Sequence, residues 1–534
     1  MLIFLCIPFE TNFISIMDNF QKFKNNFFEF PEIGISLDFG SAPFTESFLA
    51  AEKERAKLAV DSMLKLVAGS IANPDENQLV GHYWLRNPSL APSAEIKTAI
   101  STEIEKIKNF AAKIHSGEIK TSSNQPFKHI LLIGIGGSAL GPMFVGHALK
   151  SSTDKLDLKI IDNTDPDGIA ATIKAIPSLK QTLVIVISKS GSTKETRNGE
   201  LLVANAFKRA LLDFPRHAVA ITMKDSALDR RAAASGWLER FHIWSHTGGR
   251  TSQTSAVGLL PGALQGWDTE SFLQGARDMD ELTIRPQTVL NPALLLALAI
   301  LRLTKSKSDR SMVVLPYKDR LELLSRYLQQ LFMESLGKER DLDGKTVNQG
   351  LAIYGNKGST DQHALVQQLR DGPNNFFTLF IEVLKDDFYK SERDLCDTDL
   401  EVEEGGITAG DYLQGFYLGT RRALEEKGRE SITVVLPEIS EYTIGALIAL
   451  FERVVGFYAS FINVNCYNQP GVEAGKKAAA EALEIKKRAA KLIAEKNCQP
   501  NFENLQEYFS ANEQATLFKI LQRIKTSEIK KHSY

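Results

Sequence analysis

The sequence predicts an α/β fold built on two tandem parallel sheets flanked by helices. Short apolar, β-branched runs alternate with segments of helical periodicity, first between residues 129 and 223 and again from about residue 310. Strands that are buried on both faces read as continuous apolar runs, and their alternation with helices indicates right-handed βαβ units. A chain of 534 residues is too long for one compact core, so several domains are expected.

The first 115 residues are predicted to form a helical extension ahead of these sheets. From residue 45 to residue 112, charged and small apolar side chains recur at helical spacing, with a break around Ala72-Asn73-Pro74. The opening stretch is apolar, but it lacks the positive residues and the cleavage site of a signal peptide, so Met17 is favoured as the true start. No other apolar run has membrane-spanning length, and we therefore expect a soluble, cytoplasmic protein.

Two α/β domains are expected, over residues 116–290 and 291–490, followed by a C-terminal helical arm over residues 491–534. The first domain is expected to contain four strands, at 129–136, 156–164, 182–190 and 217–223. The second is expected to contain a long helix at 319–337 and three strands, at 311–316, 375–383 and 431–437. The acidic segment 385–406 lacks apolar periodicity and predicts a surface excursion without chemistry.

The composition argues against several classes of protein. A net charge of −2 disfavours nucleic acid or an anionic membrane as the main partner, so an anionic ligand needs a local site. His242 and His246 have a spacing that could bind metal on a helix, but the Glu of H-E-x-x-H is missing and no metal is expected. The cysteines form no C-x-x-C pair, which suits a reducing compartment and gives no support for zinc or disulfides. They are Cys6, Cys396, Cys466 and Cys498.

A glycine-rich turn after the first strand of the first domain has three interpretations. Gly134-Ile-Gly136-Gly-Ser-Ala139 fits the G-x-G-x-x-[GA] dinucleotide fingerprint, and Asp162 ends the next strand, where a ribose-binding acid would stand. The same turn can hold a smaller anion, because it opens a helix N-terminus with partial positive charge. A tight turn that serves only helix–sheet packing is the third interpretation.

The end of the third strand favours a phosphate. SKSGST, from Ser188 to Thr193, offers four hydroxyls, one ammonium and a glycine at the carboxyl end of a strand, where open α/β sheets bind ligands. Ser138 of the first loop can face the same point. Two converging hydroxyl loops suit a terminal phosphate monoester better than the bridging pyrophosphate of a dinucleotide. A capping box between Ser192 and Glu195 would be compatible with this function.

Three further side chains could carry chemistry, and each also has a plainer interpretation. Arg250 follows a Gly-Gly pair and could clamp an oxyanion, although a surface ion pair is the more ordinary fate of such an arginine. Glu334 lies near the end of an amphipathic helix, where it could act as a general base or simply pair with Lys338. His363 is expected in the first turn of a helix, whose positive end favours neutral imidazole, or it is merely exposed there.

The chain contains six motifs in one order: GIGGSALGP (134–142), SKSGSTKET (188–196), GGRTS (248–252), MESLGK (333–338), GSTDQHALVQQLRDG (358–372) and NQPGVEAGK (468–476). In this combination the sequence resembles the glucose-6-phosphate isomerase (phosphoglucose isomerase) family from about residue 129 to residue 480. The resemblance implies two sugar-isomerase (SIS-type) α/β domains and a homodimer. It also implies interconversion of glucose 6-phosphate and fructose 6-phosphate, in glycolysis and gluconeogenesis, without a cofactor or a metal.

The resemblance further implies roles for single residues. Glu334 would be the base that moves a proton between C1 and C2, and Arg250 would stabilise the enediolate oxygen. His363 and Lys476 would open the sugar ring, and the partner subunit would supply the histidine, so that the active sites of the dimer are shared. The substrate contacts that the resemblance implies are Gly137, Ser138, Ser188, Lys189, Ser190, Thr193, Gly249, Gln330 and Gln469.

One departure and two rival functions accompany this resemblance. Ser190 and Gly191 stand where many relatives carry a threonine and a bulkier residue, but the hydroxyl is kept and phosphate binding is still expected. The glycine turn and Asp162 would also suit a nicotinamide oxidoreductase. A non-catalytic sensor of sugar phosphates is the second rival. A sensor needs no base, so the joint presence of four candidate catalytic residues argues against it: Glu334, Arg250, His363 and Lys476.

Overall fold

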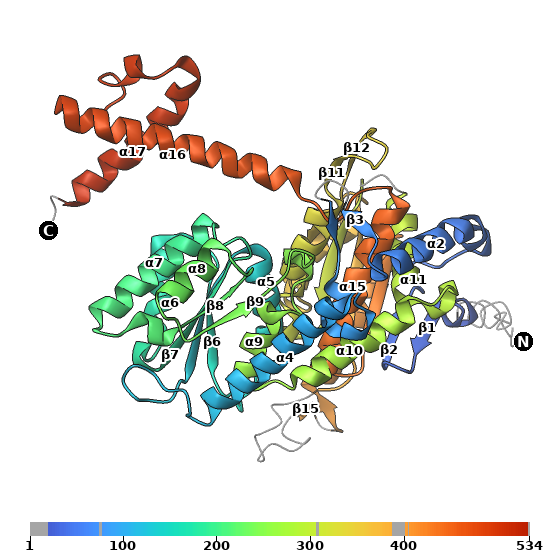
Figure 1. The fold of residues 1–534 in the computed structure, drawn as a ribbon. Helices are drawn as coiled ribbons and strands as arrows, with labels where there is room; N and C mark the ends of the chain where they lie inside the picture. The colour runs from blue at the N-terminus through green and yellow to red at the C-terminus, as the bar shows by residue number, and fades with distance from the viewer. Residues whose placement is uncertain (1–19, 74–76, 306–308, 387–400, 404, 532–534) are drawn as a thin grey trace, which may run out of the picture. The chain divides into compact units, whose positions relative to one another are not determined.

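The computed structural model describes residues 20–73, 77–305, 309–386, 401–403 and 405–531, and it confirms the expected α/β fold (Figure 1). The expected start at Met17, and most of the acidic segment 385–406, lie outside the described residues. The chain divides by compactness into one unit over Met1–Tyr467 and a second over Asn468–Tyr534. Both sheets belong to the first unit.

Five parallel strands form the first sheet, in the order β6-β5-β7-β8-β9. Neighbouring residues of β5 face opposite sides, and both sides are buried because helices cover each face. The strands are β5 (His129–Ile133), β6 (Asp157–Ile161), β7 (Thr182–Ile187), β8 (Ala218–Thr222) and β9 (Glu239–His242). Four of them match predicted strands, whereas the short β9 was not predicted.

Helices pack on both faces of this sheet. Leu131 and Ile133 of β5 share a cluster with side chains of α6, α7 and α8, whereas Ile130 and Leu132 belong to the cluster that contains side chains of α4, α5 and α9. Figure 1 shows α6, α7 and α8 gathered on the left side of the sheet. These helices are α4 (Ala94–His115), α5 (Leu140–Ala148), α6 (Pro166–Lys174), α7 (Lys194–Arg209), α8 (Ala227–Ala234) and α9 (Ala256–Gln265).

The second sheet has six strands, in the order β1-β2-β17-β14-β10-β13. β13, β10, β14 and β17 run parallel, and β2 joins β17 antiparallel through pairs such as Leu37 and Val434. The core strands are β10 (Ser311–Pro316), β13 (Ile353–Tyr354), β14 (Phe376–Val383) and β17 (Ser431–Leu436). The N-terminal pair is β1 (Phe27–Phe30) and β2 (Ile35–Asp38).

Helices also sandwich the second sheet. α13 (Val366–Asp371) and α14 (Ala409–Glu425) belong to the cluster on one face, and α11 (Pro292–Thr304) and α15 (Glu441–Phe461) to the cluster on the other. α15 is the one described helix that is long and apolar enough to cross a membrane. Since 89% of its apolar stretch is buried within the fold, it is positioned as a core helix.

The N-terminal segment contains the expected helices and, in addition, strands that were not predicted. The helices are α2 (Glu46–Val67), α3 (His82–Arg86) and α4, with a small hairpin of β3 (Ile71–Asn73) and β4 (Gln78–Leu79) at the predicted break. β1 and β2 are only four residues long, which is too short for a periodic pattern to stand out. Their partner strand lies about 400 residues further along the chain, so local sequence could not reveal the pairing.

The prediction of one long helix over 319–337 is wrong. A 3₁₀ turn over Asp319–Leu321 is followed by α12 (Leu324–Leu328) and then by a π-helical segment, η8 (Gln329–Glu334). The predicted apolar face is nevertheless buried, at Leu321, Leu324, Leu328 and Leu331. These four leucines have the sequence spacing of one face of an α-helix, so the pattern gives no warning of the change in pitch.

The second unit consists of helices packed on each other. α16 (Pro470–Lys496) and α17 (Ala511–Lys531) enclose a small apolar cluster that includes Ile485, Leu505 and Leu517. The predicted boundary between residues 490 and 491 falls inside α16. Divided by compactness, the chain begins its second unit earlier, at Asn468.

The remaining elements belong to the first unit. They are the short strands β11 (Lys338–Arg340), β12 (Thr346–Gln349), β15 (Glu401–Glu403) and β16 (Ile407–Thr408), and the helix α10 (Thr269–Thr283).

Candidate active site

Two loops of the first sheet meet where the order of its strands reverses. In the chain, β5 is followed by β6 on one side of it and then by β7 on the other. The carboxyl ends of β5 and β7 therefore flank a topological switch point, which is where open α/β sheets bind ligands. Ser138 follows β5 and Ser188 follows β7, so the fold brings both predicted phosphate loops to this edge.

Glycines let the loop after β5 lie directly against two other parts of the chain. A Cβ added to Gly137 would come within 2.2 Å of the carbonyl oxygen of Gly249, and one added to Gly136 within 3.0 Å of Gln330 Nε2. Ser252 Oγ spans the two glycine turns, 3.1 Å from Gly137 O and 2.8 Å from Gly249 O. Glycine is therefore needed at Gly137, because any side chain there would collide with the backbone of Gly249.

The loop after β7 gathers hydroxyls around its own backbone. The Oγ of the buried Ser188 accepts a hydrogen bond from Gly191 N (3.1 Å) and donates to Thr193 Oγ1 (3.2 Å). The hydroxyls of the exposed Ser190 and Ser192 lie 2.8 Å apart. Gly191 has a φ of +71°, a conformation that glycine adopts without strain. The turn thus places four hydroxyls, linked in pairs by hydrogen bonds, at the ligand edge of the sheet.

The capping box considered for Ser192 and Glu195 does not form at the start of α7. The helix begins at Lys194 with Thr193 as N-cap residue, one position later than a cap at Ser192 would require. Thr193 makes no side-chain capping bond, and its hydroxyl accepts a hydrogen bond from Ser188. The hydroxyls of this loop are therefore organised by the loop itself, not by the helix.

Lys189 reaches a third loop at the same edge. Its ammonium donates to the backbone carbonyls of Ser245 and Thr247, each at 2.8 Å. His246 lies between these two residues and stacks against Trp244. Burial, together with the positive charge of Lys189, lowers the pKa of His246 to about 4, so its imidazole is neutral at physiological pH.

Arg250 is buried, with 8% of its surface exposed, and it is not a surface ion pair. Its Nη1 donates to Ser335 Oγ (2.6 Å) and to the carbonyl oxygen of Cys466 (2.8 Å). Its Nε lies 3.5 Å from Glu334 Oε1. The protein thus fixes the guanidinium of Arg250 beside the carboxylate of Glu334.

The carboxylate of Glu334 is oriented from two sides. Gln330 Nε2 donates to Glu334 Oε2 (3.0 Å), while Arg250 faces the other oxygen. The predicted alternative, an ion pair with Lys338, is wrong for the side chain, because Lys338 Nζ donates to the backbone carbonyl of Glu334 instead (2.9 Å). The Glu334 side chain keeps 24% of its surface exposed, so it remains accessible to a ligand.

The π-helical pitch of η8 brings these side chains into register. A π turn contains more residues than an α turn, so it rotates the side chains that follow it relative to an α-helix. Gln330 and Glu334 both lie within η8, and the apolar residues Leu331 and Phe332 between them are buried. Single π turns occur frequently at functional sites, and this one carries the amide and the carboxylate of the candidate site.

His363 lies on an exposed 3₁₀ turn. The expected position in the first turn of a helix is confirmed, with Ser359 as the N-cap residue, but this helix is a single 3₁₀ turn over Thr360–His363 and α13 begins only at Val366. Within the described part of the chain, the imidazole has no hydrogen-bond or ion-pair partner. The neighbouring Gln362 is directed inward and donates to Phe416 O (2.9 Å), which leaves the histidine at the surface.

Gln469 and Lys476 belong to the second unit. Gln469 is the N-cap residue of α16 and is half-buried, whereas Lys476 lies in the second turn of the same helix and is exposed. Each of these two residues has an interaction partner. Their proposed part in the site is taken up below.

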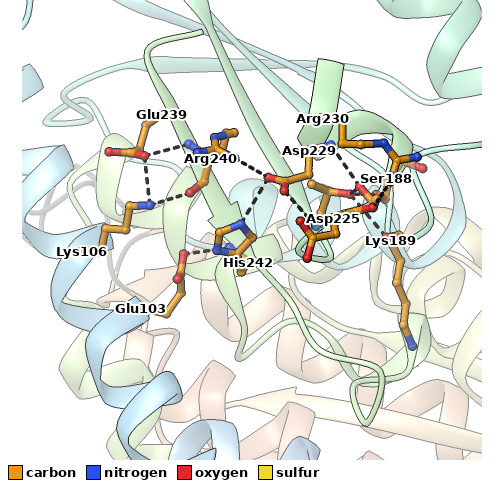
Figure 2. A network of polar contacts seen from close by, with 12 residues as sticks. Glu103, Lys106, Ser188, Lys189, Asp225, Asp229, Arg230, Glu239, Arg240 and His242 are labelled. Carbon is orange, nitrogen blue, oxygen red and sulfur yellow. Dashed lines mark hydrogen bonds and ion pairs between the residues drawn. The ribbon is translucent and has the colours of Figure 1, made fainter. Parts of the chain in front are cut away.

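The residues of two alternative sites considered from the sequence make contacts with other protein side chains. Asp162, the candidate ribose-binding acid, forms an ion pair with Arg326 (3.2 Å). His242 ends β9 and its Nε2 lies 3.3 Å from Asp229 Oδ1, as Figure 2 shows, while His246 is enclosed by aromatic rings. Among the described residues, no group of three or more His, Cys, Asp or Glu could hold a metal ion.

The cysteines are described only in part. Cys466 is buried and free, and Cys498 is half-buried and free. Cys6 and Cys396 lie outside the described residues.

Comparison with known sequences decides the family. The sequence profile of the family described as phosphoglucose isomerase matches residues 45–398 and 419–501, which is most of the chain. The chain belongs to the phosphoglucose isomerase family. It is similar to a glucose-6-phosphate isomerase of Geobacter sulfurreducens, with 55% identity over 467 residues that cover 87% of both chains. A glucose-6-phosphate isomerase of Nostoc punctiforme is 48% identical over 510 residues, or 95% of both chains.

Solved structures agree with this membership of the phosphoglucose isomerase family. A crystal structure of a glucose-6-phosphate isomerase from Chlamydia trachomatis superposes with a TM-score of 0.78 at 26% identity, over 87% of this chain and 91% of the other. A hypothetical protein from Thermus thermophilus superposes with a TM-score of 0.69 at 28% identity, over 84% and 99%. The tandem α/β architecture is therefore that of a known phosphoglucose isomerase.

Sequence reasoning missed several residues that build this site. Ser335 and Ser252 position Arg250 and the glycine turns, and each stands directly beside a predicted motif residue or within a predicted motif. Adjacency was therefore an available signal for both. The carbonyl of Cys466 left no signal, because a backbone acceptor can belong to any residue type.

Proposed function

We infer that the chain interconverts glucose 6-phosphate and fructose 6-phosphate, a step of glycolysis and gluconeogenesis. The observation that carries this inference is the pairing of Glu334 with Arg250, at 3.5 Å, beside the glycine-rich loop after β5 and the hydroxyl-rich loop after β7 at a topological switch point. A carboxylate beside a fixed cation suits proton transfer next to a carbonyl, because the cation stabilises the oxyanion that forms.

Glu334 is the proposed base. It removes the proton from C2 of the open-chain aldose, and the electron pair of that bond forms the C1–C2 double bond of an enediolate. The carbonyl pair of C1 moves onto O1, where Arg250 stabilises the negative charge. The proton of the C2 hydroxyl then passes to O1, and Glu334 returns the carbon proton to C1 as the C2–O bond becomes the carbonyl of the ketose. Gln330 holds the carboxylate by the hydrogen bond to its second oxygen. Such acid–base assistance contributes about 10²–10⁴ in rate.

The phosphate is proposed to bind at the switch-point loops and to take no part in bond breaking. Its binding energy holds the flexible open chain so that C1 and C2 stay within reach of the carboxylate. Gly137 and Gly249, whose loop backbones lie directly against each other, are proposed as further contacts of the sugar phosphate. The proposed phosphate contacts are Ser138, Ser188, Lys189, Ser190 and Thr193.

Ring opening is proposed to require His363 and Lys476, with Gln469 as a further substrate contact. The imidazole of His363 is exposed and has no hydrogen-bond or ion-pair partner among the described residues, which supports a homodimer in which each subunit supplies this histidine to its partner's site. No metal and no organic cofactor belong to the proposal, and neither does a membrane or a nucleic acid. A cytoplasmic location is part of the same proposal.

The substitution Glu334→Gln tests this function. It removes the basic oxygen while it keeps the shape of the side chain, so kcat should fall by about 10²-fold or more with little change in the affinity for fructose 6-phosphate. A coupled assay of fructose 6-phosphate conversion gives kcat, and calorimetry gives the affinity. Glu339→Gln, a few residues further along on β11, is the matched control and should keep wild-type turnover. Wild-type turnover in Glu334→Gln would remove this carboxylate from the mechanism.

A further inference from the structure

The backbone of Lys189 is locked into the edge of the first sheet. Its carbonyl accepts a hydrogen bond from Met223 N (3.1 Å), and Thr222 Oγ1 lies 2.7 Å from Ser188 O and 3.3 Å from Lys189 O. Thr222 in turn bonds Ser226, whose Oγ caps α8. The Cα of Lys189 is therefore held firmly by β8 and by the turn that follows it.

The side chain of Lys189 leaves this edge in another direction. Figure 2 shows it extending away from the polar contacts of Asp225 and Arg230. Its ammonium reaches the loop after β9, where it donates to Ser245 O and Thr247 O. Hydrogen bonds from a charged donor are roughly twice as strong as neutral ones. Two of the donor directions of this ammonium are thus directed at the protein.

The loop that Lys189 holds carries Arg250. Thr247 is three residues from the arginine, and the segment between them is the Gly248-Gly249 pair that lies against Gly137. Glycines have no side chains to stiffen this short connection, so its position depends on contacts at both ends. At one end these are the bonds from Lys189, and at the other they are the contacts of Arg250 with Ser335 and Glu334.

We propose that Lys189 is a positioning residue that ties the phosphate loop after β7 to the loop carrying Arg250. Its ammonium sets the position of the arginine relative to Glu334, so that binding of the phosphate and alignment of the guanidinium depend on one another. The proposal rests on the proposed isomerase function and assigns to this ammonium a role beyond a phosphate contact. A misplacement of about 1 Å in a reacting group can cost about 10²-fold in rate, so loosening this tie should be visible in kcat.

The substitution Lys189→Met tests the proposal through a split between kcat and phosphate affinity. If Lys189 positions Arg250, kcat should fall about 10- to 100-fold, a larger factor than any rise in the inhibition constant of inorganic phosphate that comes from losing a phosphate contact. Lys189→Arg, which keeps charged donors, should recover part of the lost kcat. Lys180→Met removes the same charge at the opposite end of β7 and should leave both quantities unchanged.

Two results would overturn the proposal. Wild-type kcat in Lys189→Met would show that the tie is not needed, and a large rise in the phosphate inhibition constant with kcat kept would make Lys189 a phosphate ligand only. If Lys189→Met does not fold, Lys189→Gln, which keeps N–H donors without the charge, is judged by the same two quantities. Absence of isomerase activity in the wild-type chain would instead refute the proposed function, so the two failures are distinguishable.

Discussion

The guanidinium of Arg250 is held in place by the protein before any substrate binds. A serine hydroxyl and a backbone carbonyl accept its Nη1 hydrogens, which leaves its Nε side facing Glu334. Fixed donors of this kind stabilise developing negative charge without reorganising during the reaction. The arginine therefore needs its planar fork of donors, which a lysine cannot reproduce.

The substitution Arg250→Lys should for this reason be severe although it keeps the charge. A lysine cannot contact Ser335, the carbonyl of Cys466 and an enediolate oxygen together, so kcat should fall by about 10²–10³-fold, the usual cost of losing one oxyanion donor. Steady-state kinetics with fructose 6-phosphate checks this. A loss below threefold would mean that charge alone is sufficient.

At the scale of elements, the loop after β9 and the segment η8 decide the site, and they differ in how far sequence predicts them. The glycines and serines of the loops are conspicuous in sequence because close backbone contact and hydroxyl clusters require those residue types. The π-helical pitch of η8 is invisible, because Gln330 and Glu334 are as compatible with an α-helix. β9 was missed since its four residues, ERFH, carry no apolar alternation.

A histidine in the loop after β9 should make the folded protein less stable in mild acid. Its His246 has a pKa of about 4 in the folded state, below the ordinary 6.5, because it is buried beside Lys189. Between these two values the unfolded chain binds a proton that the folded protein does not, so stability falls as pH decreases from 7 towards 4. At pH 5 this residue alone should cost about 2 kcal/mol.

Unfolding by urea at pH 5 and pH 7 measures that loss. In His246→Gln the titrating group is gone, so the difference in stability between the two pH values should be smaller than in wild type by about 2 kcal/mol. An identical pH dependence in the two proteins would show that His246 is not buried neutral.

At the scale of the whole molecule, buried charges join helices that are far apart in the chain. Arg86 of α3 donates to Asp280 of α10 (2.6 Å) and to Glu452 of α15 (2.5 Å), and all three side chains are buried. Breaking such a pair from one side typically costs about 3–5 kcal/mol, because the other charge stays buried alone. Sequence gave no sign of this cluster, since its members are up to 366 residues apart.

The predictability of the fold follows the same division between local and distant information. The parallel strands of both sheets are recognisable in the sequence as apolar runs. Sequence analysis therefore placed β5, β7, β10 and β17 near their observed bounds. The addition of β1 and β2 to the second sheet depends on a partner at the other end of the chain. Glu334 and Arg250 were found through motifs, but their 3.5 Å approach across the two halves emerged only from the fold.

A shared active site predicts that two inactive variants restore each other. If His363 serves the partner subunit, a dimer of one Glu334→Gln subunit and one His363→Ala subunit contains one site with both native residues. Random mixing of the two variants should then recover about a quarter of wild-type activity, because half of the dimers are mixed and each has one intact site. No recovery after subunit exchange, verified by mass spectrometry, would place the histidine in the site of its own subunit.

The central claim is that a single carboxylate, Glu334, carries the proton between neighbouring carbons of the substrate. The most direct test is to isomerise glucose 6-phosphate in deuterium oxide and to follow C1 of the product by NMR. A proton held on a carboxylate exchanges with solvent, so deuterium should enter C1 of fructose 6-phosphate on one face only, and Glu334→Gln should abolish both exchange and isomerisation. A product free of solvent deuterium after many turnovers, or undiminished exchange in the variant, would contradict the account.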